Sequence, residues 1–143
     1  MKVKVINKSN NPLPKYATEG SAGLDIHAFL DDSIVLKPMD RYIIPTGLYL
    51  EIPEGYEIQV RARSGMSIKH GITLINGVGT IDSDYRGELG VPLINLSNKE
   101  YEIKNGDKIA QIVLSKYEIL DFQLEDNLGE TKRSDGGFGH TGY

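Results

Sequence analysis

Hydrophobic and polar residues alternate along much of the chain in short stretches. Between residues 56 and 62, for example, Tyr56, Ile58 and Val60 alternate with charged and amide side chains. A period of two places apolar side chains on one face of an extended strand. The first six residues alternate as well, and further apolar runs lie at 35–36, 42–44, 48–52, 93–96, 101–103 and 109–117. The pattern therefore predicts many short β-strands.

Turn-forming residues separate these runs at close spacing. They occur at 10–12, 31–33, 37–40, 45–47, 53–55 and 104–107. Residues 64–70 interrupt the alternation and predict one short helix. Many short strands with frequent turns are typical of a β-sandwich, jelly roll or small barrel, and 143 residues suffice for one domain. The sequence thus predicts an all-β domain with one short helix.

The composition changes near the C-terminus. From Gly129 onward the composition shifts to Gly and to polar or charged residues such as Asp, Lys, Arg and Thr, with almost no apolar residue except Phe138 and Tyr143. Such a segment cannot bury enough surface to order itself. We therefore expect a β-domain at 1–128 and a flexible glycine-rich arm at 129–143.

Composition also excludes several classes of function. The chain has no cysteine, which rules out disulfides and thiolate chemistry. It has no apolar run long enough to cross a membrane and no signal peptide, so a cytoplasmic protein without membrane contact is expected. The net charge of −4 argues against a broad nucleic-acid-binding surface, although a local basic pocket remains compatible with it.

The segment at 76–89 carries the strongest candidate chemistry. It combines glycines with Asp82, Asp84, Tyr85 and Arg86. If the strand stays extended, the two carboxylates share a face. A carboxylate beside another carboxylate and a guanidinium can be kept ionised and aimed at a water molecule, as hydrolysis requires. The alternative is a solvated β-turn, because turns contain the same residue types.

Three other segments offer groups suited to an anion. Arg63, Ser64 and Gly65 lie where a strand meets the predicted helix and could bind phosphate oxygens, although Ser64 could instead cap the helix. Gln111 lies in an apolar strand and needs a hydrogen-bonding partner there. The tail at 132–142 is similar to a phosphate-binding glycine loop with Phe138 as a lid, and its alternative is plain disorder.

In order and spacing, these segments resemble the five motifs of the trimeric deoxyuridine triphosphatases (dUTPases). The matching segments are 22–28, 63–71, 76–89, 106–111 and 133–142. The resemblance extends from about Ala17 to the end of the chain. The chain departs from the family pattern at Ala62, Met66 and Ser134, where Pro, Leu and Gly are usual, and none of these changes removes a functional group.

The resemblance implies a homotrimer of jelly-roll (β-clip) subunits whose active sites are each built from three chains. The implied reaction is the Mg²⁺-dependent hydrolysis of dUTP to dUMP and pyrophosphate. This reaction limits the incorporation of uracil into DNA and supplies dUMP for thymidylate synthesis. No nucleic acid is expected as a partner.

The resemblance also implies roles for individual residues. Asp82 would activate the attacking water at the α-phosphorus, and Tyr85 would lie under the deoxyribose and exclude a 2′-hydroxyl. Asp25 would support the magnesium ion through water. Uracil would pair with Asn76 and with the backbone of Gly79, Thr80 and Ile81. The phosphates would be bound by Arg63, Ser64, Gly65 and Gln111, and the closing arm would contribute Arg133, Phe138 and Thr141.

Two alternatives stay open at this stage. A deoxycytidine triphosphate deaminase has a related trimeric fold, but it needs a glutamate placed for proton transfer at the base, whereas this chain has Asp82 within Ile-Asp-Ser-Asp-Tyr and a full glycine-rich arm. A catalytically silent nucleotide-binding homologue is the second alternative, and Asp82, Tyr85 and Phe138 argue against it. The three histidines show no metal-ligand spacing and are expected to be non-catalytic.

Overall fold

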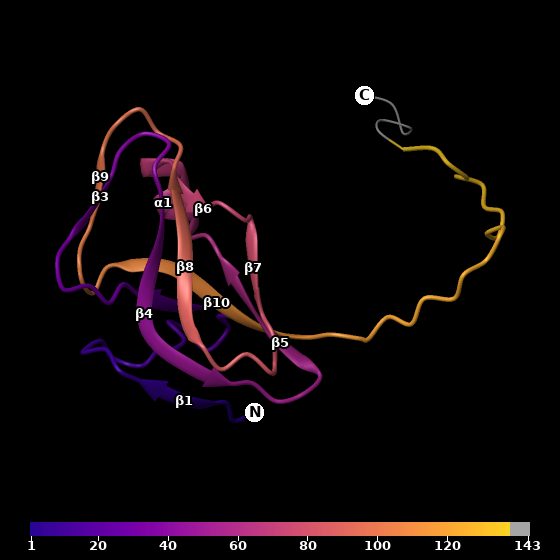
Figure 1. Ribbon diagram of the computed structural model, residues 1–143, viewed down its shortest axis with the longest axis horizontal. Helices are drawn as coiled ribbons and strands as arrows, with labels where there is room; N and C mark the ends of the chain where they lie inside the picture. Colours follow the sequence, from indigo (N-terminus) through magenta and orange to yellow (C-terminus); the bar gives the residue numbers. More distant parts are fainter. Residues whose placement is uncertain (138–143) are drawn as a thin grey trace.

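The computed structural model describes residues 1–137, which form ten strands and one helix (Figure 1). The strands are β1 (Lys4–Asn7), β2 (Leu24–His27), β3 (Ile34–Leu36), β4 (Arg41–Glu51), β5 (Tyr56–Arg61), β6 (Ile72–Leu74), β7 (Val78–Ile81), β8 (Glu88–Asn95), β9 (Tyr101–Ile103) and β10 (Lys108–Lys116). The helix α1 (Ser64–His70) follows β5. The predicted all-β fold with one short helix is confirmed.

The strands form two four-stranded sheets and a two-stranded ribbon. One sheet has the order β1-β4-β8-β6 and the other the order β2-β10-β5-β7, while β3 pairs with β9. All of these pairs are antiparallel. A single cluster of buried side chains draws on both sheets, with Ile44, Val91 and Leu93 from the first and Ile26, Val60 and Ile109 from the second. The strand β7 lies at the edge of its sheet, so one side of its backbone is not paired with another strand.

The alternating pattern located β5 well. Ile58 and Val60 are buried, whereas Glu57 and Gln59 between them are partly exposed. The burial of every second side chain is what a strand with one face on the core requires. No strand was predicted at β2, β6 or β7, which have three or four residues each.

The turn predicted at residues 45–47 is wrong, because β4 runs through it without interruption. The pairing of β4 with β8 instead shifts register between Pro45 and Tyr49, which marks a bulge. Gly47 has φ of 70°, and a Cβ there would lie 2.8 Å from Ser9. Turn-type residues therefore bend a long strand here and let another loop approach it closely.

The predicted helix is present at the predicted residues. It ends at Gly71, whose φ of 67° is left-handed and whose N–H caps the last turn. Its N-cap residue is Arg63, which makes no side-chain capping bond, so the interpretation of Ser64 as the capping residue is wrong. Within residues 1–137, no helix is long and apolar enough to span a bilayer.

The chain leaves the two sheets after β10. Figure 1 shows the following residues as an extended segment that runs away from the strands. Its apolar side chains are exposed, and they are Ile119, Leu120, Phe122, Leu124 and Leu128. Regular strands thus end at Lys116, and the division between domain and arm at residue 128 stays a prediction. Phe138 and Thr141 lie outside the described residues.

Candidate active site

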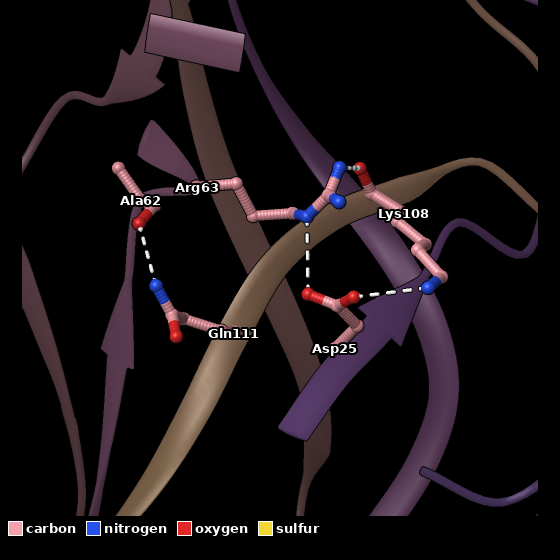
Figure 2. A network of polar contacts seen from close by, with 5 residues as sticks. All are labelled: Asp25, Ala62, Arg63, Lys108 and Gln111. Carbon is pink, nitrogen blue, oxygen red and sulfur yellow. Dashed lines mark hydrogen bonds and ion pairs between the residues drawn. The ribbon is translucent and has the colours of Figure 1, made fainter. Parts of the chain in front are cut away.

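A cluster of charged residues joins three elements that are distant in sequence. Asp25 lies on β2, Arg63 follows β5, and Lys108 begins β10 (Figure 2). Arg63 Nε lies 3.0 Å from Asp25 Oδ1, and Lys108 Nζ lies 3.0 Å from Asp25 Oδ2. Arg63 Nη1 also donates to the Lys108 carbonyl at 3.0 Å. Both carboxylate oxygens of Asp25 therefore have cationic partners.

These partners decide the charge state of Asp25. Partial burial raises the pKa of the carboxyl group, but the hydrogen bond from Lys108 and the positive charges of Arg63 and Lys108 outweigh it and hold the pKa below its usual value. The group is ionised at neutral pH. The cluster thus presents a fixed negative charge flanked by two cations.

The lowered pKa makes a prediction for stability. A carboxyl group whose pKa is lower in the folded state stabilises the fold above its unfolded pKa, and this stabilisation disappears as the pH falls through the folded pKa. Asp25→Asn should lower the free energy of unfolding at pH 7 by about 1 kcal/mol, and the difference from the wild type should vanish at acidic pH. Urea denaturation between pH 7 and pH 3 measures this.

Asp121→Asn is the matched control, since Asp121 is exposed in the C-terminal segment and its replacement should leave the free energy of unfolding unchanged. A difference between wild type and Asp25→Asn that stays constant down to pH 3 would contradict the assigned role of the ion pairs.

Gln111 lies beside this cluster and has the partner that its apolar strand requires. Its Nε2 donates to the Ala62 carbonyl at 3.1 Å (Figure 2). On the other side, a Cβ at Gly23 would overlap Gln111 Oε1. The predicted need for a partner is confirmed. The contribution of Gly23 was missed, because a close approach between two strands leaves no signal in the sequence except the glycine itself.

The first turn of α1 continues from Arg63. Ser64 and Gly65 are both exposed there. The hydroxyl of Ser64 and the backbone N–H of Gly65 are therefore accessible to a ligand that contacts Arg63. These residues, together with Gln111, form a group of hydrogen-bond donors next to an arginine, which suits phosphate oxygens.

The residues predicted to bind the base lie in the tight turn between β6 and β7, two strands of different sheets, and on β7 itself. Gly77 has φ of 72°, which a tight turn requires. A Cβ at Gly79 would lie 3.5 Å from Asn76 Nδ2, so the Asn76 side chain lies close to the backbone of β7. Thr80 and Ile81 complete the strand. Since β7 is an edge strand, its outer backbone groups are available to a ligand.

Asp82 and Tyr85 follow β7 in a compact turn. Tyr85 N donates to the Asp82 carbonyl at 3.2 Å, and Arg86 Nη1 donates to the carbonyls of Ser83 at 2.7 Å and Tyr85 at 3.0 Å. The strand ends at Ile81, so the extended arrangement predicted for the two aspartates is wrong. Arg86 shapes the turn through backbone carbonyls.

The turn borders an open hollow. The hollow has a volume of about 660 Å³ and is lined by Ile52, Glu54, Asp82, Ser83, Asp84, Arg86 and Tyr117. Asp82 is exposed, and its carboxylate is accessible to water. Both aspartates therefore face one solvent-filled space, although a turn and not a strand places them there.

Asp82 lies at the opposite end of one sheet from the candidates for phosphate binding. Strand pairing places Asp25, Gln111, Arg61 and Val78 in one row across β2, β10, β5 and β7. Asp82 lies four residues beyond Val78, past the other end of β7. With strands about 4.8 Å apart and about 3.3 Å per residue, the Cα atoms of Gln111 and Asp82 are roughly 16 Å apart.

One chain therefore brings the candidates into two clusters and not into one site. The first, the phosphate cluster, contains Asp25, Arg63, Ser64, Gly65 and Gln111. The second, the β7 cluster, contains Asn76, Gly79, Thr80, Ile81, Asp82 and Tyr85 from β7 and the turns on either side of it. Arg133 belongs to neither, since it lies in the exposed C-terminal segment and donates to the Gly136 carbonyl at 2.8 Å.

Matches to known proteins span the segments that carry both clusters. A family model described as dUTPase matches residues 9–142. A protein of Finegoldia magna named deoxyuridine 5′-triphosphate nucleotidohydrolase is 66% identical over 143 residues and is covered completely, as is this chain. A protein of the same name from Fusobacterium nucleatum is 55% identical over 142 residues, which is 99% of this chain and 97% of that protein.

Solved structures show the same fold. A dUTPase mutant of Staphylococcus bacteriophage 80alpha, described with dUpNHpp, superposes with a TM-score of 0.89 at 24% identity over 99% of each chain. A dUTPase mutant of phage phi11, whose description reports a structural Mg(II) ion, gives a TM-score of 0.81 over 91% of this chain and 100% of that one. Because the family match spans nearly the whole sequence and two relatives are more than half identical along it, the chain belongs to the dUTPase family.

Proposed function

We propose that the protein hydrolyses dUTP to dUMP and pyrophosphate. The observation that carries this proposal is the position of Asp82, which directly follows β7, the edge strand whose backbone groups suit the recognition of a base. The 66% identity to a deoxyuridine 5′-triphosphate nucleotidohydrolase along the whole chain supports it. A carboxylate next to the strand that would bind the base is placed to activate the attacking water.

The edge strand β7 suits uracil. A uracil edge presents one N–H donor between two carbonyl acceptors, and the unpaired side of β7 offers the N–H and C=O groups of alternate residues within 79–81, the other residues pointing theirs toward β5. The Asn76 amide, close to Gly79, adds a further donor and acceptor. Another base would leave some of these groups unpaired, which is the strongest form of discrimination available to a binding site.

The chemical step needs a water, a base and charge neutralisation. Asp82 accepts the proton of the water that attacks the α-phosphorus, as a general base. Arg63, which keeps N–H donors beyond those given to Asp25 and Lys108, binds the phosphate oxygens together with Ser64, Gly65 and Gln111. Phosphoryl transfer depends mostly on such positioning and charge neutralisation.

The phosphate cluster fits a magnesium ion that binds mainly to the substrate. Within residues 1–137, no group of three or more His, Cys, Asp or Glu could hold a metal, and Asp25 is already engaged by two cations. Each carboxylate oxygen still has a lone pair for a water. Asp25 would therefore hold a metal-bound water, and Mg²⁺ would neutralise the triphosphate charge.

The active site is assembled from several chains of a homotrimer. The separation of Asp82 from the phosphate cluster within one chain supports this part of the proposal, because a nucleotide whose α-phosphate contacts both Asp82 and Gln111 needs the two side chains close together. The glycine-rich arm, with Arg133, Phe138 and Thr141, closes over the bound nucleotide and excludes bulk water.

Pyrophosphate release from a panel of nucleotides tests the proposal. With Mg²⁺ present, dUTP should be hydrolysed far faster than dCTP, dTTP or UTP, and chelation of the metal should abolish the reaction. Ammonia release from dCTP would instead identify a deaminase. If no nucleotide in the panel yields pyrophosphate or ammonia, the protein is a silent nucleotide-binding homologue and the proposal fails.

A further inference from the structure

The ring of Tyr85 lies directly on the backbone of Gly87. A Cβ added at Gly87 would overlap Tyr85 Oη and Cζ and would lie 2.9 Å from Cε2. Such distances are shorter than carbon and oxygen atoms tolerate, and a close-packed neighbour does not yield to them without moving. The position of the ring therefore depends on the absence of a side chain at residue 87.

Residue 87 must be glycine because a side chain has no space there, and not because its backbone conformation requires glycine. Among the described residues, the glycines with left-handed φ are Gly47, Gly55, Gly71, Gly77 and Gly106. Gly87 is not one of them, so an alanine could adopt its backbone conformation. A substitution at Gly87 would act through the Tyr85 ring.

Several hydrogen bonds hold the ring and the turn in place. Tyr85 Oη donates to the Glu88 carbonyl at 3.0 Å, and Glu88 begins β8, where it pairs with Tyr49 of β4. The two bonds from Arg86 to carbonyls of the turn fix its other side. The backbone beneath the ring is thus anchored to a strand, and the ring is the part that would have to move.

We infer that Gly87 determines the specificity of the enzyme for deoxyribose by positioning Tyr85. This inference rests on the proposed function and on the role that the resemblance to the dUTPase family implies for Tyr85, whose ring would lie under the sugar and exclude a 2′-hydroxyl. Gly87 touches the ring and not the substrate, so it is a positioning residue. It allows the ring to lie at the one depth where a deoxyribose fits and a ribose does not.

The direction of the effect follows from this arrangement. If the added methyl group pushes the ring toward the sugar, dUTP loses binding while UTP, already excluded, loses less. If the ring moves away from the sugar, space for a 2′-hydroxyl opens and UTP binds more tightly. Both movements lower the ratio of kcat/KM for dUTP to kcat/KM for UTP.

The test compares Gly87→Ala with Gly20→Ala, for which a Cβ meets no atom within 4 Å. Both substrates are assayed on the same preparation of each variant, so that a loss of folded protein lowers both rates equally and leaves the ratio unchanged. The ratio of kcat/KM for dUTP to kcat/KM for UTP should fall by about tenfold in Gly87→Ala. The shape of a pocket can discriminate against an added hydroxyl by roughly a hundredfold, which sets the upper limit of this fall. In Gly20→Ala the ratio should stay at the wild-type value.

An unchanged ratio in folded Gly87→Ala overturns the inference. If that variant does not fold, Tyr85→Phe decides, because it removes only the hydroxyl that binds the Glu88 carbonyl; its ratio should fall severalfold, and a wild-type ratio rejects the inference. A wild-type enzyme that shows no preference for dUTP over UTP would refute the proposed function itself, which separates the two failures.

Discussion

Replacement of Asp82 by asparagine should reduce the turnover of dUTP by about 10² to 10⁴-fold, the range of a general-base contribution. Asparagine keeps the size of the side chain and most of its hydrogen bonds but cannot take a proton from water. Affinity for a non-hydrolysable dUTP analogue should therefore persist. Steady-state turnover and equilibrium binding on the same variant measure the two effects separately.

Asp84→Asn provides the matched control for this experiment. Asp84 lines the same open hollow two residues away, so its replacement changes the local charge by the same amount. We expect a much smaller loss of turnover in this variant. Near-normal turnover in Asp82→Asn, or equal losses in both variants, would remove Asp82 from its assigned role.

Two inactive variants should restore activity to each other when their chains are mixed. Arg63→Ala damages the phosphate cluster and Asp82→Asn the β7 cluster, and Asp82 lies at the opposite end of the sheet from the phosphate cluster in one chain. If a site takes one cluster from each of two subunits, random mixing leaves about a quarter of the sites with both clusters intact. Unfolding and refolding the mixture, followed by a pyrophosphate assay, measures the recovery.

A chain carrying both substitutions supplies the control, because its mixture with Asp82→Asn chains can form no intact site. Mass measurement must establish that mixed trimers are present. Mixed trimers with no more activity than the parents would show that each site is built within one subunit.

Features were predicted correctly where the interactions that determine them join residues close in the sequence. The strand β5 and the helix α1 were predicted well, because alternation at Ile58 and Val60 and its interruption after Ser64 are visible within a few residues. The turn at residues 45–47 was predicted wrongly, because what makes it a bulge is its contact with Ser9 and the pairing of β4 with β8.

The site shows the same division. A partner for Gln111 could be predicted, because an amide in an apolar strand requires one. The contacts of Asp25 with Arg63 and Lys108 could not, because they join residues 38 or more positions apart. The extended Asp82 and Asp84 were predicted from strand periodicity, which does not reveal that the strand ends at Ile81.

The exposed edge of β7 has a consequence for aggregation. Proteins usually protect an edge strand with lysine, proline or an inward-pointing charge, because an open edge can pair with another chain. An edge that pairs with a nucleobase, as we propose for β7, cannot carry such protection, and Val78 to Ile81 contain no charge and no proline. Its short length, four residues, is the protection that remains. The turn that positions Asp82 therefore also limits how far a foreign strand could extend along β7, and loosening it would make the chain more prone to aggregate.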